Sequence, residues 1–303
     1  MDTFLGLLFI ILWASAAPAA KVGIRDAEPL TLLDARFFLA GGVLLAYLYL
    51  VRRNTPWPMG RQWGQLAVLA FTNSAGYLGL SWYSFKLVPA GLFGLFIAIN
   101  PLIVALLSRI VLKRQISRNE WVGIGVAAAG LCVAALPRLQ GKETSALGVG
   151  LVLAAMIIYS CGSIYYKWAK VTLAGPPLNA WQMAIGAVLL LPFAVWFNGN
   201  HVPHFTSGLI ASFTWSALAV SIGANLLWFR LLKKDPLRAN MWLFLNPIFG
   251  YIIAWVVLGE SMNITDFAGL GLVMVGLLIS GTINIRELRR PAHTMAEANP
   301  SAK

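Results

Sequence analysis

The feature that most constrains this chain is a succession of apolar runs, each about 20 residues long, separated by short loops that hold most of the charges. A helix of that length matches the hydrocarbon core of a bilayer, which is roughly 30 Å thick. Charges, prolines and glycines punctuate the sequence so that ten runs result, near 3–23, 29–51, 62–85, 89–112, 120–137, 146–168, 177–198, 207–230, 237–258 and 265–285. We therefore predict an all-α polytopic membrane protein with ten transmembrane helices.

The composition agrees with this class. The chain is 59% hydrophobic and 11% charged, whereas soluble domains have about 25% charged residues. A net charge of +12 would point to nucleic acid in a soluble protein. Here the Lys and Arg residues gather in alternate loops, at 52–61, 109–118, 167–170, 230–238 and 286–290. The positive-inside rule then places both termini in the cytoplasm, and no nucleic-acid partner is expected.

The sequence contains an internal repeat. When Asn100 is placed on Asn246, INPLIVALLSRIVLKRQISRNEWVGIGVAAAGL (99–131) falls on LNPIFGYIIAWVVLGESMNITDFAGLGLVMVGL (245–277). This register matches an Asn-Pro pair and three glycines, which apolar composition alone does not readily align. It also pairs Trp82 with Trp228. We predict two five-helix repeats, residues 1–137 and 138–285, followed by a disordered cytoplasmic tail at 286–303.

The two repeats are expected to cross the membrane in opposite senses, because each contains an odd number of spans. The loop charges agree: Lys113, Arg114 and Arg118 lie in the loop of the first repeat, whereas the matching loop at 259–264 has no Lys or Arg. Inverted repeats of this kind are typical of secondary transporters, whose two halves rock about a site near the bilayer midplane.

Three stretches resemble a known family: DARFFLAGGVLLAYL (34–48), LVPAGLFGLFIAINPLIVALL (87–107) and LGESMNITDFAGLGLVMVGLLIS (258–280). They resemble the EamA-type transporters of the drug/metabolite transporter superfamily over nearly the whole chain. The resemblance implies ten helices and the transport, often the export, of small metabolites. It does not name a substrate. The first repeat has Lys113-Arg114 where the second has Gly259-Glu260, which departs from the pattern.

The Asn-Pro pairs predict a substrate site. Asn100 lies about 16 Å into its span from Pro89, near the middle of the bilayer, and Asn246 lies at a similar depth from the other side. Pro101 and Pro247 lack an N–H and free backbone carbonyls, which at this depth must face protein or a water-filled cavity. We predict that both Asn residues bind substrate and that both prolines act as hinges. The alternative is two structural kinks in which each Asn satisfies local backbone.

Further polar and aromatic residues in the middle of spans complete the predicted substrate site. Asn73 and Tyr77 are four residues apart and share one helical face. With them we place Trp13, Tyr159 and Trp242. The other tryptophans are assigned mainly to packing or to the interfacial belts, namely Trp57, Trp63, Trp82, Trp121 and Trp228.

Arg36 is a charge inside a span, which marks a functional candidate. We assign it to a gate or a substrate contact; the alternative is an architectural Arg that snorkels. It faces Gln182 in the repeat register, so its role is not duplicated. The carboxylates lie at or near span ends, and Glu260 is interpreted as a turn or capping residue.

Glycines seven residues apart mark a packing face on the fifth and tenth spans. Small residues at this spacing let helices approach closely. We predict that these two spans pack together as a scaffold through Gly123, Gly130, Gly269 and Gly276.

The function that these features favour is a secondary transporter, and more specifically an exporter of small metabolites such as amino acids, in the bacterial cytoplasmic (inner) membrane. Two alternatives stay open: a multidrug or cation exporter of the same fold, and a passive, channel-like facilitator. An enzyme is not expected, because acidic and His residues do not cluster at one membrane face. No cofactor or metal is expected, and the partners are a small-molecule substrate and lipid, with the chain acting as a monomer.

Overall fold

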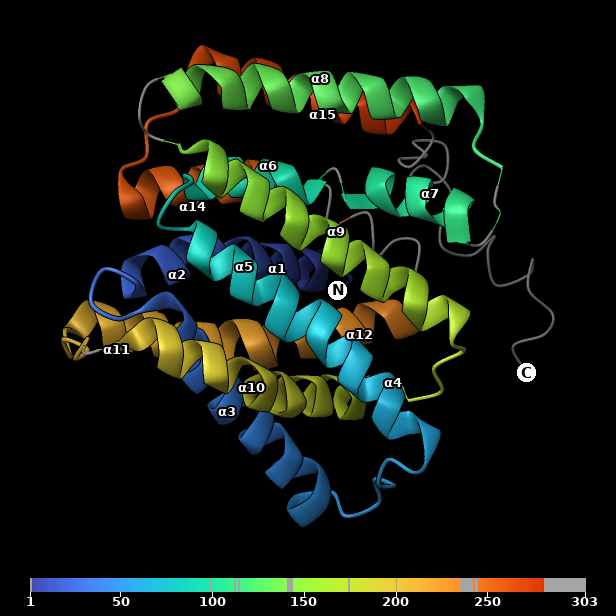
Figure 1. The fold of residues 1–303 in the computed structure, drawn as a ribbon, viewed down its shortest axis with the longest axis vertical. Coiled ribbons are helices and arrows are strands. Elements are labelled where there is room, and N and C mark those ends of the chain that lie inside the picture. Colours follow the sequence, from blue (N-terminus) through green and yellow to red (C-terminus); the bar gives the residue numbers. More distant parts are fainter. Residues whose placement is uncertain are drawn as a thin grey trace.

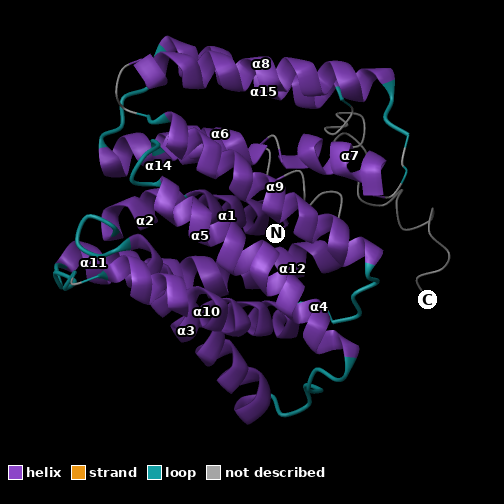
Figure 2. Ribbon diagram, in the orientation of Figure 1, coloured by secondary structure: helices purple, strands orange, loops and turns teal. Residues whose placement is uncertain are grey.

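The computed structural model describes residues 2–98, 100–111, 113, 115–140, 144–173, 175–199, 201–234, 242 and 245–280. Across these residues all regular structure is helical, and no strand occurs among them (Figure 2). The expectation of an all-α chain is therefore confirmed. The predicted tail at 286–303 lies outside the described residues.

Three of the predicted spans form single helices, α8 (Arg118–Gln140), α9 (Ala146–Trp168) and α10 (Pro176–Asn198). The described parts of the last two spans are the helices α14 (Asn246–Leu258) and α15 (Ile264–Ile279). α10 begins with two prolines, where the absence of an N–H leaves no hydrogen bond unmade. α15 begins with a capping box in which Asn263 and Asp266 exchange side-chain bonds with the backbone.

Other spans are divided into segments. These are α1 (Asp2–Ala14) with α2 (Ala16–Gly23), α3 (Pro29–Ala46) with η1 (Tyr47–Val51), α4 (Arg61–Ala70) with η2 (Phe71–Ala75) and α5 (Gly76–Ser84), α6 (Ala90–Ala98) with α7 (Asn100–Val111), and α11 (Ser207–Thr214) with η3 (Trp215–Ala224) and α12 (Asn225–Lys234). The η segments are π-helices, whose wider turns occur frequently at functional sites.

Six stretches of the described chain are long and apolar enough to cross a membrane. They are Phe4–Gly23, Pro29–Val51, Arg118–Pro137, Ala146–Tyr166, Pro176–Asn198 and Ser207–Trp228. A seventh results if Ala90–Ile97 and Leu102–Val111, bent by 41°, form one span. α14 and α15 are apolar but shorter. The protein is thus a polytopic, helical membrane protein, and the count of ten spans stays a prediction.

The principal helix pairs each join the first half of the chain to the second. α8 packs along α15, α3 along α10, α6 along α14, and α5 along α9. In Figure 1 the α8–α15 pair forms a separate layer at one end of the molecule, with the α6–α14 pair below it and α3 and α10 toward the other end. The two halves are therefore interleaved along their length.

The α8–α15 contact is made backbone to backbone. A Cβ built on Gly130 would lie 2.7 Å from the carbonyl oxygen of Gly269, and one built on Gly276 would lie 2.6 Å from that of Gly123. Real side chains do not fit at these distances, so only glycine allows the two helices to pack this closely. We call these four residues the glycine seam.

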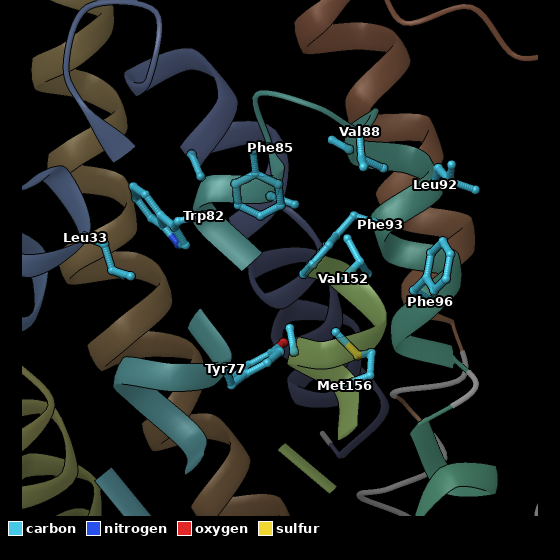
Figure 3. Close-up of a cluster of buried hydrophobic side chains, with 14 of the residues drawn as sticks. Leu33, Tyr77, Trp82, Phe85, Val88, Leu92, Phe93, Phe96, Val152 and Met156 are labelled. Atoms are coloured by element: carbon cyan, nitrogen blue, oxygen red, sulfur yellow. The ribbon is translucent and has the colours of Figure 1, made fainter. Parts of the chain in front are cut away.

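A cluster of buried side chains fills the space between α5, α6 and α9. Phe93 and Phe96 of α6 lie beside Val152 and Met156 of α9, as Figure 3 shows. Trp82 of α5 lies in the same cluster, on the side of α3. This cluster packs one side of the cavity described next.

Candidate functional site

A cavity of about 270 Å³ lies between helices of both halves of the chain. α1, α3, α5 and α6 contribute to it from the first half, and α9, α10, α12 and α14 from the second. Its walls are mostly aromatic and aliphatic, and they include Trp13, Tyr77, Trp82, Phe93, Tyr159 and Trp228. Five amide side chains also face it, those of Asn73, Asn179, Gln182, Asn225 and Asn246. We call this space the central cavity.

Most of the residues that the sequence predicts for the substrate site line this cavity. They are Trp13, Asn73, Tyr77, Tyr159 and Asn246, together with Arg36. The Tyr77 and Tyr159 rings lie 4.8 Å apart between centroids. Asn73 Nδ2 donates a long hydrogen bond of 3.5 Å to Gln182 Oε1. These contacts bring α9 and α10 of the second half against η2 and α5 of the first.

Two predicted residues lie elsewhere. Asn100 is absent from the cavity lining, and its Oδ1 accepts a 2.6 Å hydrogen bond from Ser160 Oγ of α9. Trp242 packs beside Gly6 of α1, within the cluster around Phe9. The two Asn-Pro pairs match in sequence, but only Asn246 reaches the cavity.

The predicted hinge prolines also lie in different settings. The bend of 41° between the two segments of the fourth span falls around Pro101, whose side chain lies outside the described part of the structure. Pro247 is in the first turn of α14, where a missing N–H costs no helical hydrogen bond. The carbonyl that Pro247 is predicted to free belongs to Leu243, four residues earlier, and Leu243 is not among the described residues.

Arg36 is the one charged side chain among the described residues that line the cavity. It is 5% exposed, and its Nε donates a 2.7 Å hydrogen bond to Ser221 Oγ. Ser221 lies in the π-helix η3 and donates in turn to the carbonyl of Ser216 at 3.0 Å. The guanidinium carbon lies 5.6 Å from the centroid of the Trp82 ring, within the range of a cation–π contact.

The assignment of Trp82 and Trp228 to the interfacial belts is wrong. Trp82 is 2% exposed, and both rings line the central cavity. The repeat register contains the signal that could have placed them, because it pairs Trp82 with Trp228 and also Trp13 with Tyr159 and Arg36 with Gln182. All of these pairs line the cavity.

Two further amides that face the cavity were missed from the sequence. Asn179 lies near the start of α10, and Asn225 begins α12, where its Nδ2 donates to the carbonyl of Ser221 at 2.8 Å. Neither has a polar partner in the repeat register. The only feature of the sequence that marks Asn179 and Asn225 is that each is a polar residue within an apolar run.

Glu260 is a capping residue, but the helix that it caps belongs to the other half. Its Oε1 accepts from the backbone N of Ala90 at 2.8 Å and its Oε2 from that of Gly91 at 3.1 Å. A carboxylate at this position satisfies open N–H groups at the start of α6 and suits the helix dipole. Among the described residues, no group of three or more His, Cys, Asp or Glu could hold a metal ion.

Comparison with known proteins places the chain among membrane transporters. The profile of the EamA-like transporter family matches residues 3–136 and 146–282. A protein of Salmonella typhimurium described as a probable amino-acid metabolite efflux pump is 27% identical over 293 residues, covering 92% of this chain and 94% of its own. An uncharacterized transporter of Bacillus subtilis, YoaV, is 23% identical over 283 residues, with 92% and 97% covered.

A solved structure titled only "Crystal structure of protein" has the same fold, with a TM-score of 0.62 at 20% identity, covering 96% of this chain and 99% of its own. The family match extends over most of the sequence and includes the helices that line the cavity. The chain is therefore a membrane transporter and belongs to the EamA-like transporter family.

Proposed function

We propose that this protein is a secondary transporter that exports small metabolites such as amino acids across the bacterial cytoplasmic membrane by alternating access. The observation that carries the proposal is a central cavity built jointly by both halves of the chain, with Trp13 and Tyr159, Arg36 and Gln182, and Trp82 and Trp228 as matched positions in the repeat register. A site shared by two related halves is the arrangement in which rocking of one half against the other exposes it to each side in turn.

The proposed topology has ten spans, as two inverted repeats at 1–137 and 138–285, with both termini in the cytoplasm. The family match in two stretches and the pairing of helices across the two halves support it. The stretch at 61–84 is a proposed span although its middle is polar, at Thr72, Asn73 and Ser74. These polar groups face the protein interior, where a polar side chain in a membrane helix is tolerated.

The elements around the cavity offer places at which the two halves could change shape. The fourth span bends by 41° between α6 and α7. The π-helices η2 and η3 lie beside the cavity, and their residues Asn73, Ser74 and Val220 line it. A π-helical turn exchanges with α-helix by a local shift of hydrogen bonds, so it lets a helix bend without unfolding.

Amino acids fit the cavity in size and chemistry. A volume of about 270 Å³ is slightly below the range usual for drug-sized ligands. The amide side chains offer donors and acceptors, and the aromatic walls offer apolar contact. The name of the Salmonella relative points to the same class of cargo.

Counterflow in proteoliposomes tests the proposal. Liposomes that contain the purified protein are loaded with one unlabelled compound at a time, from a panel of amino acids, organic acids and cationic drugs, and entry of the same labelled compound is followed. Acceleration by the internal pool requires a carrier, whereas a channel-like pore gives none. A protein that accelerates entry of none of the amino acids, organic acids or cationic drugs in such a panel would contradict the proposal.

A variant that fills the cavity provides the matched comparison. Gly250 lines the cavity, and a Cβ built on it meets no atom within 4 Å, so Gly250→Trp is expected to stop counterflow while the protein stays folded. Gly125 on α8 is equally open but lies outside the cavity lining. Gly125→Trp should transport as the wild type does.

A further inference from the structure

The charge balance of the central cavity singles out one chemical class of ligand. Arg36 is almost fully buried, and no described carboxylate forms an ion pair with it. Among the described lining residues there is no Asp, Glu, Lys or His. A buried charge without a counter-charge is costly, so a ligand that supplies the counter-charge gains affinity from relieving that cost.

The hydrogen bonds of Arg36 leave its terminal nitrogens available. A guanidinium has five N–H bonds, and the one on Nε is donated to Ser221 Oγ. The four N–H bonds on the two terminal nitrogens have no acceptor among the described residues. Ser221 and the Trp82 ring hold the side chain in place, and Arg36 itself lines the cavity. Two parallel N–H bonds match the two oxygens of a carboxylate.

The same cavity holds an unused acceptor. The Oδ1 atom of Asn246 is buried and has no hydrogen-bond partner in the described structure. The backbone of α6 approaches Asn246 closely at Gly94, where a Cβ would lie 3.8 Å from Nδ2. A buried acceptor without a partner favours a ligand that carries an N–H or O–H donor.

We propose that the central cavity binds small organic carboxylates with an apolar, ring-sized body, the carboxylate on Arg36 and a donor group near Asn246. This inference rests on the proposed transport function and narrows its substrate class. The aromatic walls around Tyr77 and Tyr159 receive the apolar body. A phosphate monoester is disfavoured, because its second negative charge finds no further cation among the described lining residues. An organic cation is disfavoured by the charge of Arg36 itself.

A set of compounds with one ring and different head groups tests the inference. Binding of 3-phenylpropanoate, 3-phenylpropanamide, 2-phenylethylamine and phenyl phosphate to the full-length protein in nanodiscs is measured by titration calorimetry. The acid should bind between about tenfold and a hundredfold more tightly than the amide, since charge-assisted hydrogen bonds are replaced by neutral ones. The amine and the phosphate should bind more weakly than the acid. Equal binding of acid and amide, or preference for the amine or the phosphate, would overturn the inference.

Variants of Arg36 link the preference to this residue. Arg36→Met should reduce the preference for acid over amide to about one, and Arg36→Lys should retain part of it. Because Arg36 carries an unpaired charge in the unliganded protein, Arg36→Met is expected to keep or raise the unfolding temperature. A large drop in that temperature with an unchanged acid preference would show a purely architectural Arg and contradict the inference.

The matched control is Arg109→Met. Arg109 is an exposed Arg on α7 that also lies over a tryptophan ring, at 5.8 Å from Trp121, but it is outside the cavity lining. Its loss should leave the acid preference unchanged. Counterflow of 3-phenylpropanoate separates the two proposals: selective binding without counterflow of any compound contradicts transport, whereas counterflow that favours the amine contradicts the carboxylate class.

Discussion

Glu260 and Lys21 form an ion pair, with 3.1 Å between Oε1 and Nζ. Lys21 belongs to the last turn of α2, and Glu260 follows α14. The same carboxylate accepts hydrogen bonds from the first turn of α6 at Ala90 and Gly91. One side chain of the second half therefore joins two helices of the first half, at the place where α2, α6 and α14 contact one another.

Glu260→Gln should lower the stability of the protein. The substitution keeps the shape of the side chain but removes the charge that strengthens the bonds to two backbone N–H groups and Lys21, a loss of about 1–3 kcal/mol. The measurement is thermal unfolding of the purified protein in one detergent. Lys21→Met, which leaves the backbone bonds in place, should cost less.

The control for this prediction is Glu120→Gln. Glu120 Oε2 accepts from the backbone N of Ser117 at 2.9 Å in an exposed setting. Exposure weakens the contribution of a capping charge, so this variant should lie close to the wild type. An unfolding temperature for Glu260→Gln equal to that of Glu120→Gln would contradict the prediction.

Gly130→Leu combined with Gly276→Leu should greatly reduce the yield of folded protein. Each new side chain would meet the backbone of the facing helix at less than 3 Å, so α8 and α15 must separate. Size-exclusion chromatography of the solubilised protein measures the monodisperse fraction.

Gly125→Leu with Gly271→Leu is the matched pair, because these glycines lie on the same two helices and a Cβ on either meets no atom within 4 Å. The yield of this double variant should equal or exceed that of the wild type, since Leu has a higher helix propensity than Gly. If both pairs of variants behaved alike, the glycine seam would not be a tight contact.

Asn246→Ala and Asn100→Ala should have different effects. Asn246 lines the cavity, so its loss should weaken substrate binding with little change in stability. Asn100 bonds to Ser160 away from the cavity lining, so its loss should cost about 1–2 kcal/mol of stability and leave affinity unchanged. Counterflow at several substrate concentrations, with thermal unfolding alongside, measures both. If the two substitutions reduced substrate affinity equally, the result would contradict this prediction and support a substrate contact for Asn100.

Cysteine labelling should place the loops on opposite sides of the membrane. In a background with Cys132 and Cys161 replaced by Ser, His201→Cys in the loop after α10 should react with an impermeant maleimide on intact spheroplasts. Asn54→Cys in the loop after η1 should react only after permeabilisation. Both positions are exposed. The reverse pattern would contradict cytoplasmic termini.

Much of this protein is predictable from its sequence because a membrane leaves few choices. Apolar runs must be helical to satisfy their backbone, and the repeat register then relates the two halves. Trp13, Arg36 and Tyr159 are examples of residues that the pattern assigns to a polar interior and that line the cavity. Polarity in the middle of a span is a strong signal, because it is costly anywhere else.

The remaining site residues could not be placed from the sequence, because their positions depend on side-chain packing, which the alignment of the two repeats does not specify. Asn100 and Asn246 are equivalent in the repeat, but they have different surroundings. Asn100 accepts a hydrogen bond from Ser160, whereas Asn246 lines the cavity. Trp82 was assigned to a belt, but the packing of α5 against α3 and α9 encloses its ring in the buried cluster. Two copies of one pattern thus became different once they packed against each other.

The glycine seam has a practical consequence for measuring motion. Two helices in backbone contact cannot slide or tilt without separating, so α8 and α15 should move together as one rigid unit. Spectroscopic labels on their exposed residues, such as Val122 of α8 and Phe267 of α15, should stay at a constant separation in every state of the protein. The pair therefore offers an internal ruler, against which the displacement of any other helix can be read.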